Sequence, residues 1–153
     1  MRTLGVYYSW FKRLVPVLCI AAVGCGGSSE PAPELVAVTG TVTFKSEPLV
    51  GASVSFVPRD GTPGTGAYGV TDESGKYTLT HRTDAAGIEP GIYTVAVSKM
   101  AMPDGRPIPE GQDAADVGAV QIMPPKYSDP FSEMNTNVIT VPPSGGEFPI
   151  ELK

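Results

Sequence analysis

His81 is the only histidine in the chain, so any catalysis that uses an imidazole as the base depends on this residue. A nucleophilic triad also needs a hydroxyl or thiol and an orienting acid beside the histidine. Ser55, Ser74 and Ser98 are available, but their spacing selects none of them, and no Gly-x-Ser-x-Gly elbow occurs. We therefore expect His81 to be an exposed residue that follows a hairpin strand. The protein is predicted not to be an enzyme.

Acidic residues in predicted turns and loops are the groups that could hold a calcium ion. They are Asp72, Glu73, Asp104, Asp113 and Asp116. Calcium needs six to eight converging oxygen ligands. No D-x-D-x-D-G run spaces these carboxylates, which favours solvated side chains over a binding site. We expect neither a bound metal nor a cofactor.

The first 24 residues have the composition of an export signal. Arg2, Lys12 and Arg13 are basic, and they are followed by an apolar core at residues 14–23. This core spans about ten residues, whereas a membrane-spanning helix needs roughly 20. Residues 1–24 are therefore predicted to be a signal peptide for Sec-type export, which takes no part in the fold.

Residues 22–25, Ala-Val-Gly-Cys, resemble a lipobox, the processing site of bacterial lipoproteins. The resemblance implies that a diacylglyceryl group is attached to the Cys25 thiol and that the peptide bond before it is then cut. Gly24 is the small residue that this cleavage needs, whereas the bulky Leu18 precedes Cys19. Two or more acyl chains, such as palmitate, hold a protein stably on a membrane. The alternatives are a conventional signal peptide with an incidental cysteine and an uncleaved anchor.

Both cysteines belong to this export segment, so the folded part is predicted to have no disulfide and no cysteine-ligated zinc. Removal of residues 1–24 would take away three of the 11 basic residues and none of the 16 acidic ones, which leaves a net charge of −8. An acidic chain without a Lys/Arg cluster is not expected to bind nucleic acid. Attachment to the membrane is expected to come from the acyl chains.

Beyond a flexible tether at residues 25–35, apolar and polar side chains alternate as in half-buried strands. Tyr68, Tyr77 and Tyr93 have the inward parity of their strands, so we expect them in the core. Pro149 cannot donate a ladder hydrogen bond, which predicts an edge position for the last strand. We expect about seven short strands, at residues 36–45, 52–56, 68–70, 77–79, 91–97, 137–141 and 147–153. This pattern predicts an all-β sandwich of two facing sheets.

Residues 100–134 interrupt the pattern with a long segment rich in proline, aspartate and alanine. Loops of this length are uncommon in compact domains and are either functional or disordered. Residues 117–122 are expected to form a brief extended piece. Tyr127 and Phe131 lie in the same segment, where they would either line a surface binding site or plug one end of the sandwich.

Residues 38–79 resemble the carboxypeptidase-regulatory-like domain, which is a transthyretin-like (prealbumin-like) β-sandwich. The matching segments are VTGTVTF (38–44), PLVGASVSFVP (48–58), TDESGKYTL (71–79) and GIYTVAVSK (91–99). PKYSDP (125–130) is similar to a motif in short bacterial envelope lipoproteins built on that domain. The resemblance therefore implies one such domain at residues 36–153, with the long loop at 100–134 as an insertion. It implies no catalytic residues.

Asn137 departs from this group, whose members usually have an apolar residue at its position. If its side chain points inward, it must be hydrogen-bonded or it costs roughly 1–3 kcal/mol. A related sandwich family forms Lys–Asn isopeptide bonds, for which the candidates would be Lys45, Asn135 or Asn137, and Glu89 as the acid. Lys45 has the outward parity of its strand, which argues against such a bond.

These observations predict a non-catalytic, lipid-anchored protein of the cell envelope with a structural or binding role. Cys25 would hold it at the outer membrane or the periplasmic face. Its expected partners are the membrane and, through the 100–134 loop, envelope proteins or polysaccharide. The alternative is a carbohydrate-binding module at the cell surface that uses Tyr127 and Phe131.

Overall fold

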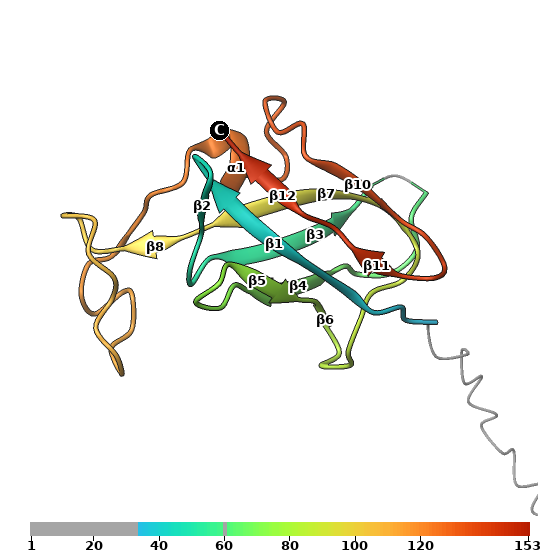
Figure 1. Cartoon of the computed structure of the whole chain (residues 1–153), viewed down its shortest axis with the longest axis horizontal. Helices are drawn as coiled ribbons and strands as arrows, with labels where there is room; N and C mark the ends of the chain where they lie inside the picture. Colours follow the sequence, from blue (N-terminus) through green and yellow to red (C-terminus); the bar gives the residue numbers. More distant parts are fainter. Residues whose placement is uncertain (1–33, 60) are drawn as a thin grey trace, which may run out of the picture. The chain divides into compact units, whose positions relative to one another are not determined.

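The computed structural model describes residues 34–59 and 61–153, so the predicted signal peptide, Cys25 and the tether up to residue 33 lie outside the described residues. The described part contains twelve short strands and one single-turn helix (Figure 1). The prediction of an all-β protein is therefore confirmed. The strands outnumber the predicted seven because the strand predicted at residues 147–153 is divided in two and because four two-residue strands lie outside the predicted ranges.

The first sheet is built around β1, Val38–Phe44, which is the central strand. Its other strands are β2 (Glu47–Pro48), β5 (Lys76–Thr78), β11 (Gly146–Glu147) and β12 (Ile150–Leu152). β2 and β5 pair antiparallel with one side of β1, and β11 and β12 pair parallel with the other. Among the described strands, β11 and β12 pair with β1 alone, and Pro149 lies in the break between them. This arrangement confirms the predicted edge position.

Gly40 is the one gap in the apolar, inward-facing side of β1. A Cβ at this position would overlap the Phe148 carbonyl oxygen and would lie 2.8 Å from the Tyr77 ring. The Tyr77 hydroxyl donates a hydrogen bond to the same carbonyl at 2.8 Å. The gap in the alternation therefore makes room for a tyrosine that links β5 to the segment between β11 and β12.

The second sheet has the strand order β10-β7-β3-β4-β6, and every neighbouring pair is antiparallel. The strands are β3 (Ser53–Pro58), β4 (Ala67–Val70), β6 (Thr80–His81), β7 (Gly91–Ser98) and β10 (Val138–Val141). Figure 1 shows β1, β11 and β12 crossing in front of β3 and β7. Between the sheets lies one apolar core, in which the Phe56 ring packs against Tyr77 at 6.2 Å and Tyr93 at 6.0 Å between ring centroids.

The predicted parity of β4 is wrong. Tyr77 and Tyr93 are buried as expected, but Tyr68 is 41% exposed and points away from the core. Ala67 and Gly69 face inward instead, because a Cβ on Gly69 would lie only 2.5 Å from a backbone carbonyl oxygen in the neighbouring chain segment. Side chains alternate strictly along a strand, so placing Gly69 inward puts Tyr68 and Val70 on the outer face, opposite to the prediction.

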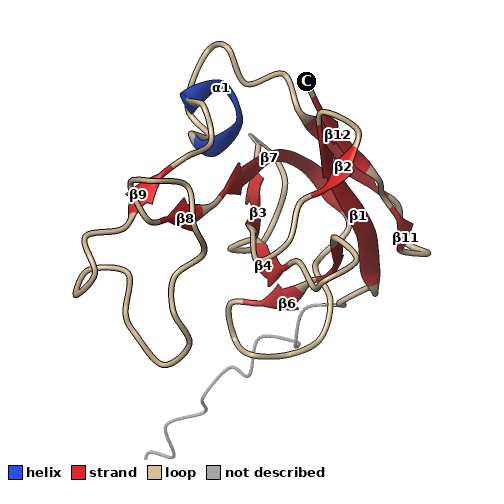
Figure 2. Ribbon diagram, turned by 60° about the vertical axis from the view of Figure 1, so that its left-hand side comes forward, coloured by secondary structure: helices blue, strands red, loops and turns tan. Residues whose placement is uncertain are grey.

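The 100–134 segment contains local structure of its own (Figure 2). β8 (Met100–Ala101) pairs with β9 (Val120–Gln121), so the extended piece expected within residues 117–122 is present in shortened form. The helix α1, Pro125–Ser128, packs against β7. No helix in the described part of the chain is long and apolar enough to cross a bilayer.

Candidate functional site

Tyr127 lies on α1 and is only 9% exposed. Its ring meets Phe44 edge-on, with the centroids 6.4 Å apart. Its hydroxyl donates a hydrogen bond to the Lys153 carbonyl oxygen and accepts one from the Lys153 backbone N–H at 2.9 Å. Tyr127 therefore plugs one end of the core and fastens the residue after β12, so its ring is not free to stack on a ligand.

Phe131, four residues further on, has the opposite environment. Its side chain is 83% exposed, and its backbone N–H donates to the Asp129 carboxylate at 2.9 Å. It borders an open groove of about 620 Å³ on the outer side of the second sheet. The structure therefore does not bring Tyr127 and Phe131 into one site, since only Phe131 faces the groove.

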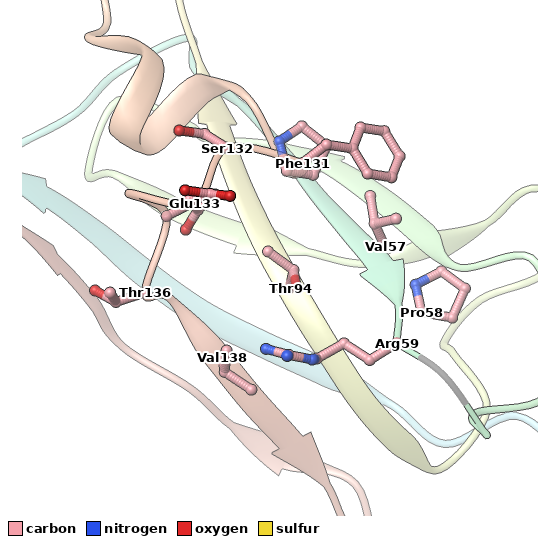
Figure 3. Close-up of a pocket in the computed structure, with 11 residues that line it drawn as sticks. Val57, Pro58, Arg59, Thr94, Phe131, Ser132, Glu133, Thr136 and Val138 are labelled. Atoms are coloured by element: carbon pink, nitrogen blue, oxygen red, sulfur yellow. The ribbon is translucent and has the colours of Figure 1, made fainter.

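Strands β3, β7 and β10 form the floor of this groove (Figure 3). Figure 3 shows the Phe131 ring on the same side as Val57, while the Arg59 side chain extends along the floor past Thr94 towards Val138. The remaining side chains come from Pro58 and from the loop between α1 and β10. The groove thus offers an aromatic ring, one cation, a carboxylate from Glu133 and several hydroxyls.

Asn135 fixes the groove loop to the sheet. Its amide Nδ2 donates to the backbone carbonyls of Val95 and Asp129, each at 3.1 Å, and its Oδ1 accepts from the Asn137 backbone N–H at 3.0 Å. Because Asn135 is buried and fully engaged, it holds the Phe131 loop over β7. The sequence offered no local signal for this role.

Lys45 and Asn137, which were also considered for an isopeptide bond, are not arranged for one. Lys45 is exposed in the turn after β1. The Asn137 side chain is half-buried, and its Nδ2 has no hydrogen-bond partner among the described residues. The Asn137 amide is therefore unsatisfied, which is the case for which the sequence analysis expected a loss of stability.

The prediction that His81 is exposed is wrong, because the residue is 3% exposed and lies beside a buried glutamate. His81 Nε2 lies 3.1 Å from Glu89 Oε1. The Thr83 backbone N–H donates to Nδ1 at 3.3 Å, and the Thr83 hydroxyl lies 2.8 Å from the same nitrogen. Since a backbone N–H can only donate, Nδ1 is an acceptor and Nε2 carries the hydrogen shared with Glu89.

Glu89 is enclosed on its other side by the loop before β4. A Cβ on Gly64 would overlap the Glu89 carboxylate, and Gly64 has a φ of +91°. Glu89 Oε2 is buried without a hydrogen-bond partner in the described part of the chain. The Tyr93 hydroxyl donates to the Glu89 backbone carbonyl at 2.7 Å. Burial, with a smaller contribution from the Glu89 charge, raises the pKa of Tyr93 to about 12.

None of these enclosed residues lines the Phe131 groove. Within residues 34–59 and 61–153, no group of three or more His, Cys, Asp or Glu side chains is arranged to hold a metal ion. The Phe131 groove is an open surface site, whereas the His81–Glu89 pair belongs to the interior of the fold.

Fold and groove together define an all-β protein with two five-stranded sheets and an open surface site. No protein-family model matches the sequence, and no curated protein matches it either. Among solved structures, the chain is similar to a 9R-lipoxygenase from Cyanothece PCC8801, with 15% identity and a TM-score of 0.37. The similarity covers 81% of this chain and 17% of the lipoxygenase chain.

Proposed function

We propose that this is a non-catalytic, lipid-anchored protein of the bacterial cell envelope whose β-domain, residues 36–153, has a binding role. The Ala-Val-Gly-Cys sequence at 22–25 supports the anchor at Cys25. The fold is proposed to be a transthyretin-like sandwich of the carboxypeptidase-regulatory-like kind. This assignment is supported by the coincidence of VTGTVTF with β1 and of GIYTVAVS with β7.

The exposure of Phe131 is the single observation that carries the binding role. An apolar ring that is 83% exposed contributes little to the core, yet Asn135 holds its loop against β7 with two hydrogen bonds at 3.1 Å. Concave sites that combine an aromatic side chain with a few polar groups are typical of ligand-binding sites.

The anchor is tested by labelling with a radioactive fatty acid in a bacterial host that expresses the full chain. We expect Cys25→Ser to abolish labelling and to leave residues 1–24 uncleaved. Cys19→Ser is the matched control and is expected to be labelled and processed like the unmodified protein. Equal labelling of both variants, or no labelling of the unmodified chain, would contradict the proposal.

A second candidate function is that of a carbohydrate-binding module at the cell surface. The groove favours it because the Phe131 ring lines the same groove as the hydroxyl of Thr94 and the charged groups of Arg59 and Glu133. Aromatic rings pack on the apolar faces of sugars while polar side chains bind the hydroxyls. A glycan array tests this candidate, with Phe131→Ala expected to lose any signal that the unmodified protein gives.

A further inference from the structure

The strand β10 lies at the edge of the second sheet, and its outer side is open. Among the described strands it pairs with β7 alone. The Val95 N–H donates to the Asn137 carbonyl at 2.8 Å, and hydrogen-bonded positions alternate along an antiparallel pair. The backbone N–H and C=O groups of Val138 and Thr140 therefore point away from β7, where no described strand accepts or donates to them.

An open groove of about 220 Å³ borders this edge and lies between residues 136–139 and residues 149–151. Glu151 is the one charged residue that lines it. Because Ile150 and Leu152 are buried, the Glu151 side chain points to the outer side of the first sheet, away from the second sheet. A further strand can therefore reach the edge of β10.

The edge of β10 has none of the features that prevent pairing between sheet edges. Charged residues, prolines and very short strands are the usual ones. The other edge strands of the two five-stranded sheets have them: Glu47 and Pro48 on β2, Lys76 on β5, Glu147 on β11, Pro149 and Glu151 at β12, and the two-residue length of β6. β10 has the sequence Val-Ile-Thr-Val, and all four residues pair regularly with β7.

Two side chains of opposite charge are associated with opposite ends of β10. Figure 3 shows Glu133 and Thr136 together on the loop that leads into the strand. Arg59 belongs to the other end, because its N–H donates to the Ile92 carbonyl at 2.9 Å and Ile92 pairs with Thr140. Its side chain extends across β7 towards β10 (Figure 3). Neither Arg59 nor Glu133 forms an ion pair with another described residue.

We propose that β10 pairs with β10 of a second copy of the chain, antiparallel and about a two-fold axis at Val138. Thr136 of one copy then faces Thr140 of the other. Since Glu133 is associated with the Thr136 end and Arg59 with the Thr140 end, each copy brings its Glu133 to the half of the other that carries Arg59. A two-fold contact has to be complementary to itself, and this distribution of charge meets that condition.

The position of the axis follows from the backbone groups that are available. An axis at Ile139 would place Pro142, which has no N–H, opposite Thr136. An axis at Val138 instead pairs residues that all have an N–H and a C=O. The inference goes beyond the proposed function, because it concerns the edge of the second sheet and not the Phe131 ring or the anchor.

A disulfide across the axis tests the pairing. Residues that face each other in a hydrogen-bonded antiparallel pair have Cα atoms about 5.5 Å apart, which a disulfide can span. We therefore expect Val138→Cys, in the full chain expressed in a bacterial host, to give a disulfide-linked dimer when the membranes are oxidised with copper phenanthroline. Non-reducing gel electrophoresis measures the yield.

Two controls separate the pairing from random collision. Val70→Cys is the matched control, because Val70 is 62% exposed on the same face of the sheet but lies on β4, far from the axis. We expect no dimer from Val70→Cys. The unmodified chain, whose cysteines are Cys19 and Cys25, should give none either.

Exchange of the two charges tests the orientation of the second copy. Arg59→Glu or Glu133→Arg, each added to Val138→Cys, replaces attraction by repulsion and should lower the dimer yield about three- to tenfold. Both substitutions together restore opposite charges and should restore the yield, which a general effect on folding would not do. Circular dichroism of each variant checks that the fold is retained.

Four outcomes would overturn the inference. They are the absence of a dimer from Val138→Cys, an equal yield from Val70→Cys, no recovery in the double charge exchange, and a disulfide of Val138→Cys with a different protein. The last result would assign the edge of β10 to another chain. Each of them leaves fatty-acid labelling of Cys25 unaffected, so a failure of the dimer is distinguishable from a failure of the anchor.

Discussion

The imidazole of His81 and the carboxylate of Glu89 form a buried pair, with Nε2 and Oε1 3.1 Å apart. His81 is 3% exposed and Glu89 is 5% exposed, so neither group is well solvated. A buried carboxylate is costly unless it is paired and hydrogen-bonded. The pair therefore links the edge strand β6 to the segment that leads into β7.

Loss of the histidine alone is expected to destabilise the fold strongly. His81→Ala leaves the Glu89 carboxylate buried without its partner, which typically costs about 3–5 kcal/mol. The free energy of unfolding in urea at neutral pH measures this loss. The double variant His81→Phe, Glu89→Leu removes both polar groups, and we expect it to be more stable than His81→Ala. Equal stability of His81→Ala and the unmodified protein would show that the pair contributes nothing.

Gly64 is expected to be more sensitive to alanine than Gly61 in the same loop. Both residues have positive φ, +91° and +84°, so either substitution costs about 1–2 kcal/mol of backbone strain. Only at Gly64 would the new Cβ also overlap the Glu89 carboxylate, whereas at Gly61 it meets nothing within 4 Å. Thermal unfolding of the two variants compares them directly. A loss at Gly61 as large as that at Gly64 would refute the close contact.

High pH should destabilise the protein through its buried tyrosines. Burial raises the pKa of Tyr93 from the model-compound value of 10.0 to about 12, and it raises the pKa of Tyr77 as well. In the unfolded state these tyrosines therefore lose their phenolic protons at a lower pH than in the folded state. The stabilisation is fully present below pH 10 and falls as pH rises from 10 towards 12. The loss is up to about 1.4 kcal/mol per pH unit for each tyrosine. Urea unfolding between pH 8 and 12 measures the slope. Tyr93→Phe should reduce this slope, and an unchanged slope would contradict the assignment.

Substitution by alanine should lower the stability of the fold much more at Tyr127 than at Phe131. Tyr127→Ala removes a buried ring and the hydroxyl that binds Lys153, so we expect a loss of about 3–5 kcal/mol. Phe131→Ala changes an exposed side chain and should alter stability by less than about 0.5 kcal/mol. Chemical unfolding of both variants measures the contrast. Similar losses in the two would mean that Phe131 is part of the core.

The sequence predicted those parts of the fold that depend on local alternation and on backbone chemistry. Val38 and Val42 face inward as their spacing indicates, and Pro149 lies at the edge where its missing N–H is harmless. The predicted burial of Tyr68 was wrong because the contact of Gly69 with another segment sets the parity of β4. The residues of the strand itself do not reveal this contact.

The candidate site was less accessible to prediction. Tyr127 and Phe131 lie in a segment without periodicity, so their sequence gives no parity from which burial could be inferred. His81 is buried beside Glu89, and the two residues meet because the loop between β6 and β7 folds back on β6. Asn135 likewise holds the Phe131 loop through a hydrogen bond to the Val95 carbonyl on β7, which is 40 positions away in the sequence. Such contacts between distant segments exist only in the folded chain.

The account depends most on the chemistry at Cys25, and mass spectrometry of the mature amino-terminal peptide tests it directly. We predict a peptide that begins at Cys25 and carries the mass of a diacylglyceryl group, with or without a further acyl chain on its amino group. A peptide that retains residues 1–24, or one with an unmodified Cys25 thiol, would contradict the lipid anchor and with it the proposed place of the protein in the cell envelope.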